Sequence, residues 1–384
     1  MKYILYIFLF VILFSCNSIK VVNVSYVKKL PKNYFLYMLP RNIISIDIEL
    51  TEIKTINGPY YKFAEKFLGI KNVPQSNSIE YFISNADLKV LSEPDSNNLY
   101  FVIPSCKKQI KSISLTNTGI ITSINSDNTE KYDNERANNL VNNYIPFQSE
   151  TFTELSQKDF IKIKIDTIWK QVKIDTNFVR IPVQKKTIDT LSFESKAKEA
   201  AHHILRLRKR LFKLLTGAYE KVPIMNSVSD VIKELKNEEE EYLSLFIGKT
   251  FTYKLNYRYY YTPDNKDYGK KVDLCFYSST KGISNNNFTN NKPVVLEINN
   301  NGTLSRLDTT FNKFNKASNK KGFVYRIPEI VTASLIVGEN ILIEKQVSIS
   351  QLGVLCNLPV NYINKKHFVQ FNPTYGNIIK IGCK

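Results

Sequence analysis

The chain has 384 residues, enough for two domains, and its hydrophobic fraction of 43% is that of a folded protein, which excludes a largely disordered chain. A formal net charge of +18 would suggest nucleic acid or an anionic membrane surface as a partner. The excess is mostly lysine, in a chain crowded with the other residues that AT-rich codons encode, so we treat the charge as weak evidence about partners.

The N-terminus has the features of an export signal. Lys2 is followed by an unbroken apolar run from Tyr3 to Phe14. A membrane-spanning helix needs about 20 apolar residues, so this run is too short to span but suits a secretory signal. It closes on Leu13-Phe14-Ser15-Cys16, which resembles a bacterial lipobox. We predict a signal peptide over residues 1–15 and a lipid anchor on Cys16, with an ordinary cleaved signal or a true membrane helix as the alternatives.

The export signal also bears on the partners. Several acyl chains on one cysteine hold a protein stably on a membrane, so the membrane itself is the first expected partner. Nucleic acid is excluded because the signal sends the chain out of the cytoplasm.

Residues 16–193 are predicted to form a β-rich domain with one short helix. Apolar residues alternate with polar ones from Ile44 to Leu50, as in a half-buried strand. The helix begins at Gly58-Pro59 and ends at Gly69, the expected asymmetry of proline at the start and glycine past the end. Its apolar residues have helical spacing: Tyr60, Phe63, Ala64, Phe67 and Leu68.

Three segments that place Asn and Gly between alternating residues predict β-hairpins, because these residues accept the positive φ that tight hairpins demand. They are 114–120, 297–303 and 370–377. One precedes and two follow a central region with helical periodicity, which indicates two β domains, the second over 248–384.

The central region, residues 194–247, predicts an αα-hairpin with its loop starting at Gly217. On a helical wheel Arg208 projects from the apolar stripe of the first helix, and Glu239 from that of the second. An unpaired charge there would be costly, so we predict an inward, bidentate Arg208–Glu239 ion pair that sets the register of the helices. The opposite face of the first helix is basic: Arg206, Lys209, Arg210 and Lys213.

The histidines give no metal site. His202 and His203 are adjacent, so on a helix they point about 100 degrees apart, whereas two ligands on one face need i, i+3 or i+4 spacing. His367 is remote in sequence. No nucleophile, phosphate-binding or zinc motif appears in a supporting context, so we expect no metal, no cofactor and no enzyme activity.

Two further features leave alternatives open. Alternation puts Tyr253, Tyr257, Tyr259 and Tyr261 on one face of a strand, together with Phe251 and Leu255. This face is either a sheet core or an aromatic platform that stacks on sugars. Of the cysteines that remain after Cys16, Cys356 and Cys383 are the pair we favour for a disulfide, while four reduced cysteines are the alternative.

Several blocks of the chain resemble a family of uncharacterised Bacteroidota lipoproteins that is defined only as a domain of unknown function. The blocks cover nearly the whole mature chain in order: Met38-Leu39-Pro40, Gly58-Pro59-Tyr60 to Leu68-Gly69, Phe178 to Val183, Glu199-Ala200-Ala201 to Leu215-Thr216-Gly217, Glu241-Tyr242-Leu243 to Lys249, Tyr325-Arg326-Ile327-Pro328 and Gln351-Leu352-Gly353-Val354. The resemblance implies an envelope location and a β-rich body with a helical insert, and no catalytic or binding residues.

Surface-exposed lipoproteins of that phylum often carry acidic residues after the lipidated cysteine. Asn17-Ser18-Ile19-Lys20 has none, which favours the periplasmic side of the outer membrane.

The expected fold is α+β, mainly antiparallel β, with two β domains and an inserted αα-hairpin. The expected function is that of a non-enzymatic interaction or assembly module in an envelope protein complex, with a glycan or peptidoglycan binding module as the alternative and an enzyme of unrecognised type as the third class.

Overall fold

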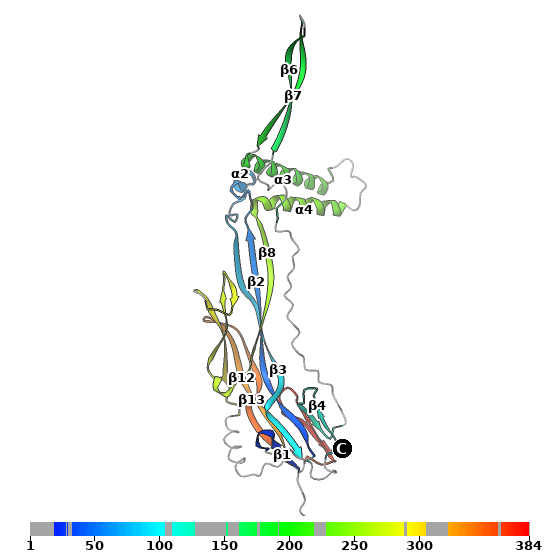
Figure 1. Ribbon diagram of the computed structural model, residues 1–384, viewed down its shortest axis with the longest axis vertical. Helices are drawn as coiled ribbons and strands as arrows, with labels where there is room; N and C mark the ends of the chain where they lie inside the picture. The colour runs from blue at the N-terminus through cyan, green and yellow to red at the C-terminus, as the bar shows by residue number, and fades with distance from the viewer. Residues whose placement is uncertain are drawn as a thin grey trace, which may run out of the picture. The chain divides into compact units, whose positions relative to one another are not determined.

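The computed structural model describes residues 19–27, 29, 33–103, 110–126, 151–152, 161–174, 177–190, 192–218, 228–287, 290–304, 322–359 and 362–383. Most of these residues lie in antiparallel strands and fewer in helices, so the predicted α+β class with mainly antiparallel β structure is confirmed (Figure 1). The elements in chain order are β1 (Lys20–Asn23), η1 (Val24–Tyr26), β2 (Phe35–Ile56), η2 (Tyr61–Phe63), α2 (Ala64–Leu68), β3 (Ser78–Ile103), β4 (Ile113–Leu115), β5 (Ile121–Ile124), β6 (Ile161–Ile174), β7 (Asn177–Thr190), α3 (Phe193–Leu215), α4 (Val228–Ile247), β8 (Lys249–Tyr261), η4 (Asn265–Asp267), β9 (Lys271–Ser278), β10 (Gly282–Ser284), β11 (Lys292–Asn300), β12 (Phe323–Val337), β13 (Asn340–Leu358), β14 (His367–Phe371) and β15 (Ile378–Cys383).

The chain forms two compact units, and each combines segments that are distant in sequence. Unit 1 is Met1–Leu50, Phe82–Asn142 and Leu255–Lys384, and unit 2 is Thr51–Tyr81 and Asn143–Lys254. The strands form sheets of order β1-β3-β2-β8, β10-β9-β11-β12-β13, β15-β14-β5-β4 and β6-β7. The division predicted in sequence order, 16–193, 194–247 and 248–384, differs from this one because strands from both ends of the chain pair within the same sheets.

Unit 1 has two hydrophobic clusters. In the first, the apolar face of β2, which includes Ile44, Ile46 and Ile48, packs with Leu88 of β3 against the inner faces of β9, β11, β12 and β13. The apolar residues of the predicted alternation, from Ile44 onward, therefore form the face of β2 that lies on the core. The second cluster joins β1 and the adjoining ends of β2 and β3 to β5, β12 and β14.

The helices of unit 2 share a third cluster. Tyr60 and Ala64 are fully buried against apolar residues of α3 and α4, which form the predicted αα-hairpin. The short helix α2 ends as predicted at Gly69, whose φ of 70° is left-handed and whose N–H bonds back to Ala64 and Glu65. Gly58 lets the chain approach α4 closely, because a Cβ there would lie 2.4 Å from the Leu245 carbonyl oxygen. No helix in the described part of the chain is both long and apolar enough to span a membrane.

Two of the three predicted hairpins are confirmed. β4 and β5 pair across Gly119, and β14 and β15 pair across Gly376, both with positive φ. In the third segment Gly302 also has positive φ and follows β11, but β11 pairs with β12, which begins only at Phe323. Residues 305–321 lie outside the described residues.

A buried arginine connects the three sheets of unit 1. Arg326 on β12 donates from Nη1 to the Pro40 carbonyl of β2 and from Nη2 to Asp95 Oδ2 of β3, each at 2.7 Å. Its backbone N–H donates to the Gly376 carbonyl between β14 and β15. The side chains of Arg326 and Asp95 are only 6% and 5% exposed, so this is a buried ion pair.

Replacing Asp95 by Asn should lower the free energy of unfolding by about 3–5 kcal/mol near pH 7, because the buried Arg326 loses its counter-charge. Burial alone would raise the pKa of Asp95, but the hydrogen bond from Asn98 and the charge of Arg326 hold it below its ordinary value. A carboxyl with a depressed pKa stabilises the fold above its unfolded pKa, about 3.9, and this contribution is lost as the pH falls through the folded pKa.

Denaturant unfolding across the pH range measures this effect. The difference between the native chain and Asp95→Asn should shrink progressively below about pH 4. The control is Glu93→Gln, because Glu93 pairs with Arg41 at 33% and 38% exposure and should cost under about 1 kcal/mol. Equal losses in the two variants would contradict a special role for the buried pair.

Candidate functional site

The structure brings Arg208 and Glu239 together. Arg208 Nε donates to Glu239 Oε1 at 2.7 Å, across α3 and α4. The side chain of Arg208 is 44% exposed and that of Glu239 19%, so the pair lies at the border of the helix interface, whereas an inward pair was predicted. The described contact is also through Nε alone, where a bidentate one was expected. The residue that enters the interface is Leu207, which is fully buried.

A double-mutant cycle on Arg208→Ala and Glu239→Ala tests this placement. A partly exposed ion pair is screened by water, so we expect a coupling energy of about 0.2–1 kcal/mol in denaturant unfolding. A coupling of several kcal/mol would instead require the buried pair that the wheel predicted.

Of the two adjacent histidines of α3, His203 contacts side chains of α4. His203 Nε2 lies 2.9 Å from Glu238 Oε1, and its ring packs on that of Tyr242 with centroids 4.2 Å apart. His202 is exposed. Among the described residues, no group of three or more ligating side chains comes together.

The tyrosine-rich strand lies on the hydrophobic core. Tyr257, Tyr259 and Tyr261 of β8 are partly buried against the first cluster of unit 1, and Tyr253 is buried in unit 2. Burial raises the pKa of the Tyr259 hydroxyl, and a hydrogen bond with the Cys275 thiol raises it further. The alternative of a sheet core therefore fits this strand better than an open platform for sugars.

Truncating Tyr259 should accordingly reduce stability. Tyr259→Ala removes a half-buried ring and should cost a few kcal/mol, somewhat less than the about 3–5 kcal/mol of a fully buried aromatic residue. Tyr259→Phe keeps the packing and loses only one hydrogen bond, about 1 kcal/mol. Thermal or denaturant unfolding of both variants checks the order; two variants as stable as the native chain would support a surface platform instead.

The predicted disulfide is wrong in this structure, since Cys356 and Cys383 are both free. Cys356 lies on β13 opposite Tyr325, whereas Cys383 lies on β15 opposite His367 in another sheet. Burial raises the pKa of the Cys356 thiol, and its hydrogen-bond partner is Tyr325. Cys16, the predicted lipidation site, lies outside the described residues, as does Cys106.

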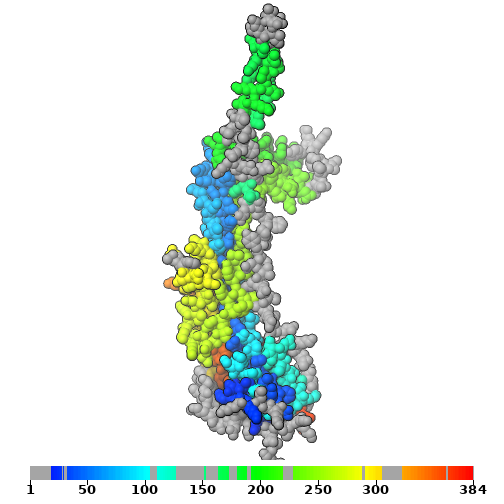
Figure 2. All heavy atoms as spheres, viewed as in Figure 1, coloured from blue at the N-terminus to red at the C-terminus, as the bar shows by residue number. Residues whose placement is uncertain are grey.

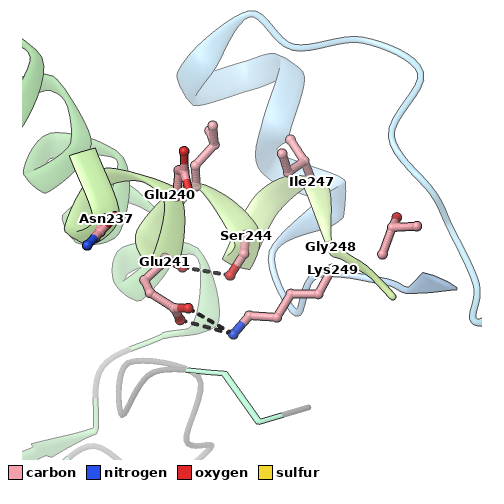
Figure 3. Close-up of a pocket in the computed structure, with 9 residues that line it drawn as sticks. Asn237, Glu240, Glu241, Ser244, Ile247, Gly248 and Lys249 are labelled. Atoms are coloured by element: carbon pink, nitrogen blue, oxygen red, sulfur yellow. Dashed lines mark hydrogen bonds and ion pairs between the residues drawn. The ribbon is translucent and has the colours of Figure 1, made fainter. Parts of the chain in front are cut away.

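A hollow of about 350 Å³ lies at the C-terminal end of α4 (Figure 3). Lys249 reaches along it, and its ammonium group donates to both carboxylate oxygens of Glu241, at 3.2 and 3.0 Å, and to the Thr151 carbonyl at 3.0 Å. The same ammonium lies 5.6 Å from the centre of the Phe152 ring. Through these contacts Lys249 connects the C-terminal part of α4 to residues 151–152.

A second hollow, of about 190 Å³, contains three carboxylates, from Asp47, Glu49 and Asp87. Arg258 holds Asp47 through two hydrogen bonds of 2.5 and 2.9 Å. Lys89 lies 3.7 Å from both Asp47 and Asp87. Ser84 donates to Glu49 at 2.8 Å. Each of these carboxylates thus has a partner that stabilises its charge.

The most distinctive surface belongs to β6 and β7. They pair antiparallel without a bulge from Ile161↔Thr190 to Ile174↔Asn177, and among the described strands they pair only with each other (Figure 1). A two-stranded sheet on its own is marginally stable in water. Within the described part of the chain, this hairpin therefore gains no support from a third strand.

Both faces of the β6–β7 hairpin present apolar side chains. Directly opposed residues share a face, so Ile163, Ile165 and Trp169 lie on one side, and Ile168, Val172, Ile181 and Val183 on the other. All of them are between 39% and 62% exposed, Trp169 the most, and Figure 2 shows atoms of this hairpin, in green, at the surface. The charged residues between them are mainly basic: Lys164, Lys170, Arg180, Lys185 and Lys186, with Asp166.

Sequence reasoning missed this surface. It treated residues 161–190 as further strands of a β domain, because alternation indicates a strand but not whether that strand finds a second layer. One signal was present: Trp169 is the single tryptophan of the chain and lies opposite Pro182, a residue that sheets accept mainly at their edges.

A model described as a domain of unknown function, DUF4831, matches residues 35–162 and 176–379. The chain belongs to this family.

No curated protein and no solved structure matches the chain. The family match leaves out residues 163–175, which are most of β6, so it carries no information on the side chains of that strand.

Proposed function

We propose that this member of the DUF4831 family is a lipoprotein of the bacterial cell envelope, of the Bacteroidota type that its sequence blocks resemble. Its signal peptide is removed, Cys16 is acylated, and the body faces the periplasm from the outer membrane. There it acts as a non-enzymatic interaction or assembly module, and its partner is another envelope protein. The observation that carries the interaction role is the uncovered β6–β7 hairpin.

The two-sided apolar surface of the hairpin supports a protein partner. A membrane surface can cover only one face of a flat hairpin, whereas Trp169 and Val183 lie on opposite faces. Exposed apolar side chains rimmed by polar residues are typical of surfaces that bind proteins. The excess of basic side chains favours an acidic partner over a second copy of this chain.

The partner would bind by adding a strand of its own to the outer edge of β6. Pro182 has no N–H to donate, yet the ladder between β6 and β7 is unbroken at this position. The Trp169–Pro182 pair is therefore a non-hydrogen-bonded pair, in which the backbone groups of both residues point away from the partner strand. The outer edge of β7 is therefore interrupted at Pro182. β6 contains no proline, and its outer edge keeps every N–H donor that an added strand needs.

A matched pair of proline variants tests this role. Thr167 of β6 and Gln184 of β7 are directly opposed, two residues from the Trp169–Pro182 pair, so their N–H groups also point outward. Proline at Thr167 removes a donor from the outer edge of β6, and proline at Gln184 removes one from the outer edge of β7. Both substitutions leave the ladder between the two strands intact. We expect affinity purification from solubilised envelopes to recover a stoichiometric membrane-protein partner with the native chain and with Gln184→Pro. Thr167→Pro should lose it.

The anchor is tested in the same cells. Radioactive palmitate should label the native chain and both proline variants, whereas Cys16→Ala should carry no label. Protease added to intact cells should not cut the native chain. Recovery of the chain alone, or equal loss of the partner in both proline variants, would contradict the interaction role, and an unlabelled native chain would contradict the anchor.

A further inference from the structure

Three strand ends lie side by side at one end of the sheet β1-β3-β2 in unit 1. Lys20, the first residue of β1, lies opposite Ile103, the last residue of β3. Tyr34, directly before β2, packs its ring edge-on against Phe101 of β3, with centroids 4.9 Å apart. Because neighbouring strands are about 4.7–4.9 Å apart, the starts of β1 and β2 are separated by roughly 10 Å across β3.

The chain enters this end of the sheet almost directly from the predicted anchor. Ile19 is fully buried in the second cluster of unit 1, so its position is held by the fold. Only Asn17 and Ser18 separate it from Cys16. Three residue steps span at most about 11 Å even when fully extended. An acylated Cys16 would therefore hold Ile19 within about 11 Å of the anchored residue, with the start of β2 roughly 10 Å farther across the sheet.

The side chains at this end suit a membrane interface. Tyr34, Phe35 and Leu36 are consecutive and exposed, at 40%, 51% and 39%. Lys20, at the start of β1, is exposed at the same end of the sheet. Aromatic side chains are enriched at the headgroup level of membranes, and a lysine near the surface is attracted to anionic lipids. This end of the sheet therefore combines apolar side chains with a positive charge, as a lipid interface requires.

We propose that residues 34–36, with Lys20, rest on the bilayer that holds Cys16, so that unit 1 binds the membrane through a defined surface as well as through its lipid. The proposal rests on the proposed acylation of Cys16. The occupant is the lipid surface because the short link from Cys16 to Ile19 brings headgroups to this patch before any protein partner.

Tryptophan depth measurements on the full acylated chain test the proposal. Trp169→Phe removes the single natural tryptophan, and Phe35→Trp then places a probe in the patch. The matched control is Ile341→Trp, at an exposed position in the same unit. Ile341 lies at the opposite end of β12 and β13 from Phe323, whose ring is 5.5 Å from that of Tyr37.

The chains are reconstituted in vesicles of phosphatidylethanolamine and phosphatidylglycerol, part of which carries bromine in the acyl chains near the headgroup. We expect the emission of Phe35→Trp to shift to the blue and to be quenched, while that of Ile341→Trp is unchanged. Hydrogen exchange on chains that keep Phe35 and Trp169 gives a second measurement: residues 33–36 should exchange more slowly in the vesicle-bound lipoprotein than in a soluble, unacylated chain that begins at Asn17.

The outcomes separate this inference from the proposed function. If the chain floats with the vesicles but Phe35→Trp is quenched no more than Ile341→Trp, and residues 33–36 exchange equally in both forms, the membrane-facing patch is overturned and the anchor stands. If the chain purified from cells carries no lipid and does not float, the anchor is overturned, and the patch with it.

Discussion

The guanidinium of Arg326 is the interaction on which unit 1 depends. Arg326 lies on β12, and its guanidinium donates to the Pro40 carbonyl of β2 and to Asp95 of β3. The backbone N–H of Arg326 donates to the Gly376 carbonyl between β14 and β15. Three sheets with separate hydrogen-bond ladders thereby meet at one residue. A planar donor with several N–H groups can satisfy a carboxylate and a carbonyl at once, which a lysine in the same place could not do with the same geometry. Burial makes the pair specific, because either partner alone would be an uncompensated charge.

Further polar contacts connect segments of β2 and β13 near Arg326. Gln351 exchanges hydrogen bonds with the backbone of Asn42, whose side chain is fully buried and bonds with Ser350 of β13. Gly353 is required by space: a Cβ there would lie 1.9 Å from the Ile327 carbonyl oxygen. The register of β12 and β13 shifts beside this contact. The residues around Arg326 and Gly353 thus hold the sheets of unit 1 together.

Short sequence patterns predicted local structure correctly, but they did not predict which distant strands pair. The Gly69 cap, the αα-hairpin and two Asn-Gly turns each depend on a few consecutive residues. The pairing of Arg258 with Asp47, 211 residues apart, places β8 beside β2 and has no local signal. On α3 the wheel placed Arg208 within the apolar stripe, whereas Leu207 is the buried residue and Arg208 lies at the border of the helix interface. A wheel gives the periodicity of a helix but not which side meets its neighbour.

The β6–β7 hairpin differs from the sheets that form the core of unit 1. There the apolar face of β2 meets a second layer, which includes β11 and β12 in the first cluster. In the hairpin, the paired positions carry apolar side chains on both faces, and among the described strands the two have only each other as sheet partners. Backbone pairing alone leaves such a hairpin marginal, and the proposed partner would supply the contacts that it lacks. Because proline interrupts one edge and not the other, such a partner would have a preferred side from which to approach. A binding partner would therefore complete the fold of this segment as well as recognise it.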